Sequence, residues 1–524
     1  MLSLTSLTNN IVNFKLYEEK VLEMSKKVGA NSIKDQLEEI DRDILKNRNK
    51  KVFRNKGKKR LDFKTTLAEV EIYRRVYLID EKELEKIENK ENNTLYELAR
   101  KRLDLGFKTI CFLDEILSLK KFGKLSEGVV ELIVKYIQDN SYRKTAEIVN
   151  DITGLNISGT TVWNIVKIIG NMLKEKEIYE FKKTTEEVIE CKNKDNHIVF
   201  NELDGVYFTL QGRDRKNAVE SYTKRHPDKE IVPKSVRKKE LKITTIYEGW
   251  KREGKNRNSL VNKKIYAQVV DNFKIKELTT MYINNTYDQN QLKLIVKNSD
   301  GGTWTKDKTK EKSIYQLDYF HIKQMIHRQI REKEDIKEMI KLLENKEYLK
   351  MLELSESLKY KYDGEVKEIE KLNILRDYIR KNINSFERYQ DTEIFKKVKQ
   401  ESFIYNNLGT QESTNYSKIT KRMKRRRMSF SIEGADNLSR VIAMFGSFDY
   451  EGLSNMFEVQ ILPQKAIDEA EEYIKKIEMN IEKQKNIKKK ISKIKYNDSF
   501  NTHIPGLELK IDKEMIEIKN MILG

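Results

Sequence analysis

Hydrophobic and polar positions along the chain change their spacing several times, and each change marks a different kind of element. From the start to about residue 49, aliphatic residues recur among mixed charges, which predicts one or two surface helices. Between Lys58 and Leu78 the sequence is rich in β-branched and aromatic residues that alternate with charged ones. This alternation predicts a short hairpin with a basic edge, either a small structural sheet or a surface where Arg74 and Arg75 contact phosphate.

A pair of capped helices is predicted between Ser141 and Leu173. Ser141 can cap the first helix, Gly154 supplies the turn, and Ser158 can cap the second. Polar side chains near the start of the second helix lie where recognition helices meet base edges. The pair therefore looks like a helix-turn-helix with a long turn, although a plain helical hairpin has the same pattern. The candidate DNA contacts are Thr160, Thr161, Asn164 and Lys167.

Apolar runs between residues 190 and 330 predict five strands, with a helix after the third and another after the fifth. The first two strands are separated by a lysine-rich loop that we expect to be disordered. Three meander strands, a helix, a strand, and then a strand and helix form the element order of an RNase H-like α/β fold. In that order, acids at the ends of the first and fourth strands lie beside each other. The strands begin near His197, Lys242, Lys263, Leu292 and Ser313.

A long helical stretch and a basic helix follow. Residues 331–399 have charged, helical-period sequence with scarcely a breaker, which predicts an all-helical insertion in the α/β domain. In the stretch 409–428, Glu412, Ile419 and Met423 share one helical face with Tyr416. The flanks of this helix carry seven cations, which suit an enzyme that acts on a polyanion. The candidate DNA contacts among them are Lys421, Arg422, Arg425 and Arg426.

These patterns divide the chain into six predicted regions. An N-terminal helical region with the hairpin precedes the helix-turn-helix region, and the catalytic core is split in two by the helical insertion. A long charged helix near the C-terminus is expected to form a bundle or dimer contact. The regions are 1–125 (N-terminal), 126–180 (helix-turn-helix), 190–330 (first part of the core), 331–399 (insertion), 400–460 (second part of the core) and 461–524 (C-terminal helical region).

Composition narrows the class of partner. The chain has 524 residues and a net charge of +20, from 103 Lys and Arg against 83 Asp and Glu, which favours a polyanionic partner. Abundant Lys, Ile and Asn, as in proteins of AT-rich genomes, account for part of that excess. The two cysteines form no metal-ligand spacing and fit a reducing compartment. With neither a signal peptide nor a run of about 18 apolar residues, we expect a cytoplasmic protein without a membrane partner.

Three acids are candidates for a metal site. Asp204 and Asp300 each end an apolar run and precede glycine, and Glu412 leads the apolar face of the basic helix. Carboxylates at one site could hold two Mg²⁺ ions for phosphoryl transfer, because hard cations prefer oxygen ligands. Taken singly, Asp-Gly after a strand also makes an ordinary turn, and a first-turn glutamate also favours a helix dipole.

Five spaced motifs then carry a resemblance to a known family. ELDGVYF, NSDGGTW, LDYFH, GTQESTN and RMKRRRM follow one another in order, with SYRKTAEIVN and GTTVWNIV upstream. Across roughly residues 53–448 the chain resembles the DDE transposases of bacterial insertion sequences, in particular the ISLre-type group, which is distantly similar to Mutator-like transposases. One departure is Phe430, where relatives are expected to carry tryptophan, and a large aromatic side chain is retained there.

The resemblance implies a site and an activity. Asp204, Asp300 and Glu412 match the catalytic, metal-binding acids, which hold two Mg²⁺ or Mn²⁺ ions, while Asp318 and His321 match an accessory element with a structural or DNA-positioning role. The implied enzyme binds the terminal repeats of its element as double-stranded DNA, cuts them and joins the 3′-hydroxyl ends to target DNA, as a homodimer or higher oligomer. Two alternatives remain: a non-catalytic DNA-binding protein derived from a transposase, or an RNase H-like nuclease without strand transfer.

Overall fold

The chain divides into two units, residues 1–460 and 461–524, and everything described here belongs to the first. The computed structural model describes residues 14–87, 94–186, 197–254, 257–269, 272–302, 312–401, 403–409, 416–424, 428–448, 450 and 452–453. The predicted C-terminal helix therefore lies outside the described residues.

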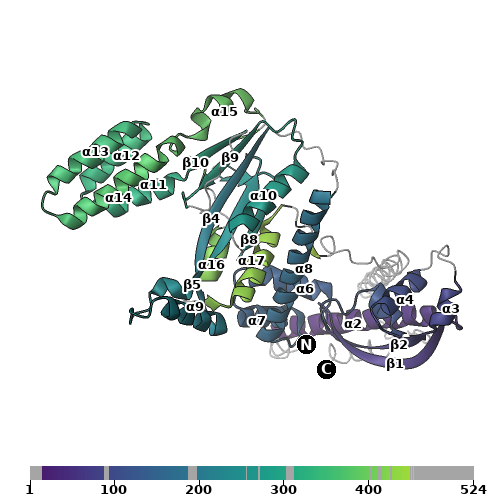
Figure 1. The fold of residues 1–524 in the computed structure, drawn as a ribbon. Coiled ribbons are helices and arrows are strands. Elements are labelled where there is room, and N and C mark those ends of the chain that lie inside the picture. The colour runs from purple at the N-terminus through teal and green to yellow at the C-terminus, as the bar shows by residue number, and fades with distance from the viewer. Residues whose placement is uncertain are drawn as a thin grey trace, which may run out of the picture. The chain divides into compact units, whose positions relative to one another are not determined.

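A mixed sheet of six strands lies at the centre of this unit (Figure 1). Its order is β10-β9-β4-β5-β8, with the short β11 paired to the end of β4. β4 is antiparallel to β5, and β5 to β8, whereas β9 runs parallel to both β4 and β10. The strands are β4 (Ile198–Leu210), β5 (Lys238–Tyr247), β8 (Lys264–Gln268), β9 (Leu294–Ser299), β10 (Ser313–Leu317) and β11 (Ser429–Phe430).

Helices cover both faces of the sheet, which explains why its strands are apolar on both sides. Ile243 and Ile265 lie on the face that packs against α17 (Ile432–Gly446) and α8 (Gly159–Glu186). Ile246 and Tyr266 point to the other face, where α10 (Asn272–Thr286) packs. Since successive residues of a strand point to opposite faces, this alternation places the core on either side of β5 and β8.

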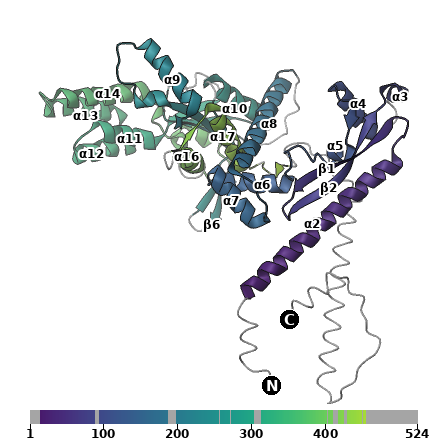
Figure 2. The ribbon, with the colours of Figure 1, turned by 90° about the horizontal axis from the view of Figure 1, so that it is seen from below.

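An N-terminal sheet is built from β1 (Phe53–Lys64), β2 (Glu69–Ile79) and β3 (Thr109–Ile110), with α2 (Phe14–Asn47) packed on β2 (Figure 2). The predicted hairpin is thus present and longer than expected. Arg74 is buried and paired with Asp114, and Arg75 is paired with Asp41 on α2. Because those guanidinium groups are held inside the fold, the suggestion that they contact phosphate is wrong. Short helices α3 (Glu81–Glu85), α4 (Thr94–Asp104) and α5 (Phe112–Ile116) complete this region.

The capped helix pair forms where it was predicted. α6 (Glu127–Ile137) precedes α7 (Tyr142–Thr153), and α8 follows α7 after a five-residue connection. Ser141 Oγ accepts the Lys144 N–H at the start of α7, and Ser158 Oγ accepts the Thr161 N–H at the start of α8. Gly154 ends α7 with φ = 75°, a left-handed conformation that glycine adopts without strain.

Residues 331–399 are all described and contain helices and turns but no strand. The first three of these helices pack on one another and on α11 (Tyr319–Gln329), which follows β10, through a shared core that includes Met339, Leu343 and Leu375, whereas the fourth contacts β9. The helices are α12 (Lys333–Glu344), α13 (Tyr348–Lys361), α14 (Val366–Asn382) and α15 (Glu393–Val398), with single 3-10 turns η2 (Ile383–Ser385) and η3 (Tyr389–Asp391).

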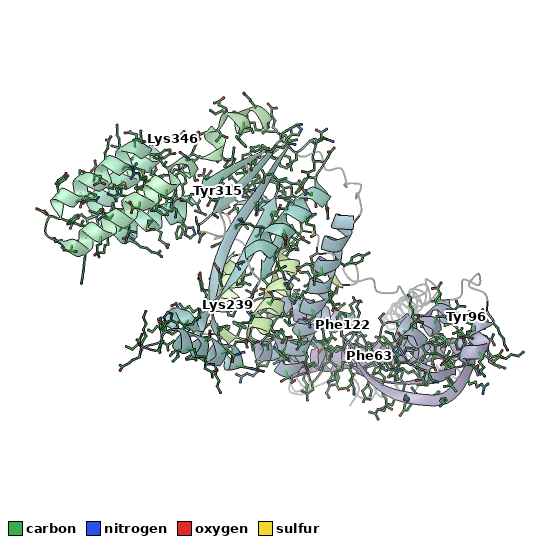
Figure 3. The ribbon with its side chains drawn as sticks, in the orientation of Figure 1. Phe63, Tyr96, Phe122, Lys239, Tyr315 and Lys346 are labelled. Atoms are coloured by element: carbon green, nitrogen blue, oxygen red, sulfur yellow. The ribbon has the colours of Figure 1, made fainter. Side chains whose placement is uncertain are left out.

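The connection between β4 and β5 differs from the expectation of a disordered loop. It contains α9 (Gly212–Arg225) and the 3-10 turn η1 (Lys234–Arg237), and β5 begins directly after η1. Lys239, labelled in Figure 3, lies on that first part of β5 and pairs with Phe208 of β4. Further along, β6 (Trp250–Gly254) and β7 (Arg257–Leu260) form a separate small hairpin.

Candidate active site

Strand register places two of the candidate acids side by side. In the parallel pair β4 and β9, Leu203 is the partner of Ser299, and the next residues along the chain are Asp204 and Asp300. Adjacent strands lie about 4.8 Å apart, so the two backbones are neighbours at this point. The apolar runs that precede both acids are the buried parts of these strands.

The two acids line a small cavity together with the accessory residues. Besides Asp204 and Asp300, Asp318 and His321 from the start of α11 line it. Asp318 is fixed as the N-cap of α11, because its Oδ1 accepts the Phe320 N–H at 2.8 Å. The structure thus brings together four of the five candidate site residues, and their roles stay predictions.

Glu202 and Asn298 also line the cavity, although the sequence pattern does not predict them as site residues. Glu202 is 1% exposed and accepts hydrogen bonds from the Tyr247 hydroxyl and from Asn298 Nδ2. The same Nδ2 donates to Asp318 Oδ2 at 3.3 Å. Asn298 therefore links two carboxylates, and only the pairing of β4, β5 and β9 brings these groups together.

The carboxyl group of Asp204 has a strongly shifted pKa. Burial is the largest cause of the rise in its pKa from 3.8 to about 7, and the charges of Asp300 and Asp318 add to the rise, while the hydrogen bond from the Gly205 N–H at 2.6 Å and the charge of Lys424 oppose it. The Asp204 carboxyl group is thus more readily protonated than that of an exposed aspartate. A cation beside this carboxylate would remove the penalty of its ionisation.

Glu412 lies outside the described residues, and the described segments on either side of it contact elements that carry the cavity residues. Gly409 has φ = 97°, and a Cβ there would lie 3.2 Å from Asp318 Oδ2. On the other side, α16 (Tyr416–Lys424) contacts β4, and Lys424 acts on the Asp204 charge.

The donors at this site suit Mg²⁺, the ion that the resemblance implies. Asp204, Asp300 and Asp318 supply carboxylate oxygens, the ligand type that hard cations prefer. Asn298 also lines the cavity, and its buried Oδ1 accepts no hydrogen bond from any described residue. Within the described part of the chain, no three such groups converge in metal-ligand geometry. The described residues therefore fit Mg²⁺ by the type of their ligand atoms and not by an assembled coordination geometry.

Comparison with known proteins identifies the family. The sequence profile of an uncharacterised protein family, UPF0236, matches residues 7–86 and 225–449, more than half of the chain. The chain belongs to this family. Two UPF0236 proteins of Caldanaerobacter subterraneus subsp. tengcongensis are each 23% identical to it over 329 residues, or 61% of the chain. The chain spans only 56% and 53% of the lengths of these two relatives.

Among solved structures, the Drosophila P element transposase strand transfer complex is similar to this UPF0236 chain at a TM-score of 0.19 and 11% identity. That match covers 75% of the chain and 91% of the transposase chain. As for membranes, none of the described helices is long and apolar enough to cross one.

The predicted base-contacting residues of this UPF0236 protein lie on the first turns of α8. Thr160 and Asn164 are exposed, and Thr161 is half-buried. Lys167 is engaged within the protein, because its Nζ lies 2.9 Å from Glu433 Oε1 and 5.6 Å from the Trp163 ring centroid. Two residues on this surface are thus open to a ligand, while Lys167 would have to leave Glu433 to bind phosphate.

The basic helix of the UPF0236 chain holds one clear departure from the prediction. Arg422 is 3% exposed, donates to the Ile137 carbonyl oxygen at 3.1 Å, and lies over the rings of Tyr142 and Phe430. Burial lowers the pKa of its guanidinium. The expectation that Arg422 contacts DNA is therefore wrong: it follows Ile419 by one helical turn and shares its buried face.

The other basic positions of the helix have different outcomes. Lys421 is exposed and lies 3.4 Å from Asp139, in a pair that solvent screens on both sides. Arg425 and Arg426 lie outside the described residues. Of the four predicted contacts on this helix, Lys421 is the one that the structure places at the surface.

Proposed function

We propose that this UPF0236 protein is a DNA transposase of an insertion sequence, which cleaves and joins DNA strands by metal-dependent phosphoryl transfer. The observation that carries the proposal is the neighbouring position of Asp204 and Asp300, in one cavity with Asp318 and His321. Two carboxylates on adjacent parallel strands, one of them strained by burial, form a site that gains stability from a bound cation. The five spaced motifs supply the specific comparison with DDE transposases.

The strand order supports an RNase H-like core for this proposal. Three antiparallel strands, β4, β5 and β8, are followed by α10 and then by β9 and β10, which pair in parallel on the other side of β4. This is the order expected for such a core, with the helices of residues 331–399 inserted between β10 and α16.

Each residue has a proposed role. Asp204, Asp300 and Glu412 would hold two Mg²⁺ or Mn²⁺ ions. When bound, such ions activate a water or a 3′-hydroxyl and stabilise the leaving oxygen. Asp318 is a positioning residue, because it caps α11 and accepts a hydrogen bond from the Asn298 amide, which also donates to Glu202. His321 lines the cavity one turn later and faces the DNA strand that enters it.

DNA recognition is assigned to α7 and α8 as a helix-turn-helix. Thr160 and Asn164 would contact base edges from the exposed start of α8, and each good contact discriminates by about 1–3 kcal/mol. Element ends and target duplex would be held together by a dimer or higher oligomer. An Asn164→Ala protein should lose preference for element ends while keeping its affinity for random duplex, measured by competition binding.

Product mapping tests the reaction. The full chain is incubated with Mg²⁺ and DNA carrying its own element ends, and nicked, cleaved and joined products are resolved on denaturing gels. Asp204→Asn and Asp300→Asn should each lower the rate by about 10²-fold or more while DNA affinity is retained, because a charged metal ligand is lost. Asp363→Asn, in an exposed turn, is the matched control.

Two results separate the alternatives. Cleavage without joined products would assign a nuclease that lacks strand transfer. Cleavage by Asp204→Asn at the parental rate would remove this cavity from the chemistry.

A further inference from the structure

Helix α9, between β4 and β5, carries charged residues over most of its surface. None of its residues is buried, although it is a regular helix of 14 residues. Residues 212–239, which include α9 and η1, carry ten cations against four carboxylates. The five cations on the helix are all exposed: Arg213, Arg215, Lys216, Lys224 and Arg225.

No ion pair within the described part of the chain accounts for these charges. None of the five cations has a described carboxylate within 4.0 Å. Asp214, the nearest acid in sequence, instead accepts the Ile432 N–H at 2.7 Å. A helix of 14 residues that buries no side chain fully and lacks such pairs is marginal by itself, since most helical stability in proteins comes from a covered face.

The N-terminal end of α9 is nevertheless held to the core by hydrogen bonds. The Gln211 N–H donates to the Phe430 carbonyl oxygen at 3.0 Å, and the bond from Ile432 to Asp214 joins α9 to the start of α17. Ala218 packs partly against the main core. The cations are thus carried by a helix that is held at one end and contacts η1, while the five cationic side chains themselves are exposed to a partner.

Strand β4 connects α9 to the candidate acids, so its length gives the distance between them. β4 passes Asp204, where β9 ends, and continues to Leu210 before α9 begins at Gly212. Eight residues of extended chain span about 26 Å. At 3.4 Å per base pair, this distance corresponds to about eight base pairs of duplex.

We propose that α9 and η1 form a docking surface for the phosphate backbone of double-stranded DNA, about eight base pairs from the phosphate held at Asp204. The spacing rests on the proposed function, whereas the backbone contact itself does not. Arg213, Lys216 and Lys224 lie on one face of the helix, opposite the side of Ala218 that meets the core. These three residues are the principal contacts.

The test measures binding of the full chain to a fluorescein-labelled 40-base-pair duplex of random sequence, by anisotropy across a range of NaCl concentrations. The triple variant Arg213→Gln, Lys216→Gln, Lys224→Gln should raise Kd at 0.1 M NaCl by at least about tenfold. It should also reduce the slope of log Kd against log[NaCl] by about 2.7, which is 0.9 per lost phosphate contact.

Two control variants make the result specific. Lys20→Gln, Lys27→Gln, Lys82→Gln removes the same charge from exposed positions of α2 and α3 and should leave the slope within about one unit of the parent. The exchange Arg213→Lys, Lys216→Arg, Lys224→Arg keeps the charge and should bind like the parent. The thermal midpoints of all variants are compared, so that a variant that loses its fold is recognised. If the Gln triple variant is unfolded, the charge-keeping exchange still tests the proposal, because a folded exchange variant should keep the parent's Kd and slope.

The outcomes for α9 and for the active site are separable. If the α9 triple variant matches the α2–α3 control in both Kd and slope, the docking surface is refuted even where the parent cleaves DNA. If the parent cleaves nothing but the triple variant loses affinity and slope, the proposed reaction fails and the docking surface stands. On cleaved end DNA, hydroxyl-radical protection about eight base pairs from the cut should vanish in the triple variant; protection that persists overturns the placement.

Discussion

Replacing Asp204 by asparagine should make the metal-free protein more stable, and by an amount that grows with pH. The raised pKa means that the folded state holds the proton more tightly than the unfolded state, for which the reference value is 3.8. The resulting penalty is absent below about pH 3.8, grows as pH rises, and becomes constant above about pH 7. For a shift from 3.8 to about 7 it amounts to about 2 kcal/mol at pH 5 and about 4 kcal/mol at pH 8.

Differential scanning fluorimetry between pH 5 and pH 8 measures this effect. The gain in stability of Asp204→Asn over the parent should increase by about 2–3 kcal/mol across that range, or by about 5–10 °C in Tm for a cooperative unit of 150–250 residues. Added Mg²⁺ should raise the Tm of the parent at pH 8 and leave the variant unchanged, because a ligand of the folded state stabilises it by mass action. Asp363→Asn serves as the control. A Tm difference between Asp204→Asn and the parent that stays constant from pH 5 to pH 8 would refute the reasoning.

Two further substitutions test how the core is assembled. Arg422→Ala should lower stability by about 2–4 kcal/mol, because it empties a buried site and leaves the Ile137 carbonyl unpaired, whereas Lys421→Ala should leave Tm within about 1 °C; equal Tm values for the two would contradict the burial of Arg422. Gly170→Ala should cost about 1–3 kcal/mol in chemical denaturation, since its Cβ would lie 2.6 Å from Asn437 Cα, and an unchanged midpoint would show that α8 and α17 are further apart.

The sequence predicted the mixed α/β sheet and the neighbouring acids because both depend on local signals. Buried parallel strands appear as apolar runs, and Asp204 and Asp300 end two such runs. Glu202 and Asn298 could not be placed in the same way, since polar residues within a strand gain their meaning only from the pairing register. The position of Glu412 stays a prediction, supported by Gly409 beside Asp318.

Helix α9 and the burial of Arg422 differ from the sequence prediction for different reasons. The segment of α9 is rich in charged residues and is followed by two prolines, which is typical of a loop, and the contact that secures it joins Asp214 to Ile432, 218 residues away. Arg422 has charged neighbours, although its spacing from Ile419 places it on the apolar face. In an arginine, the aliphatic stem can matter more than the charge.

The pairing of β11 with the end of β4 has a consequence for biosynthesis. Phe430 pairs with Leu210, so the ribosome must add 220 residues after β4 before the strand acquires this neighbour. At about 5–20 residues per second, that interval lasts about 11–44 s. During it, Val206 and Phe208 lack the cover that α16, β11 and α17 later provide. The nascent chain therefore presents an apolar strand end to chaperones, while the N-terminal sheet, complete by residue 110, can fold first.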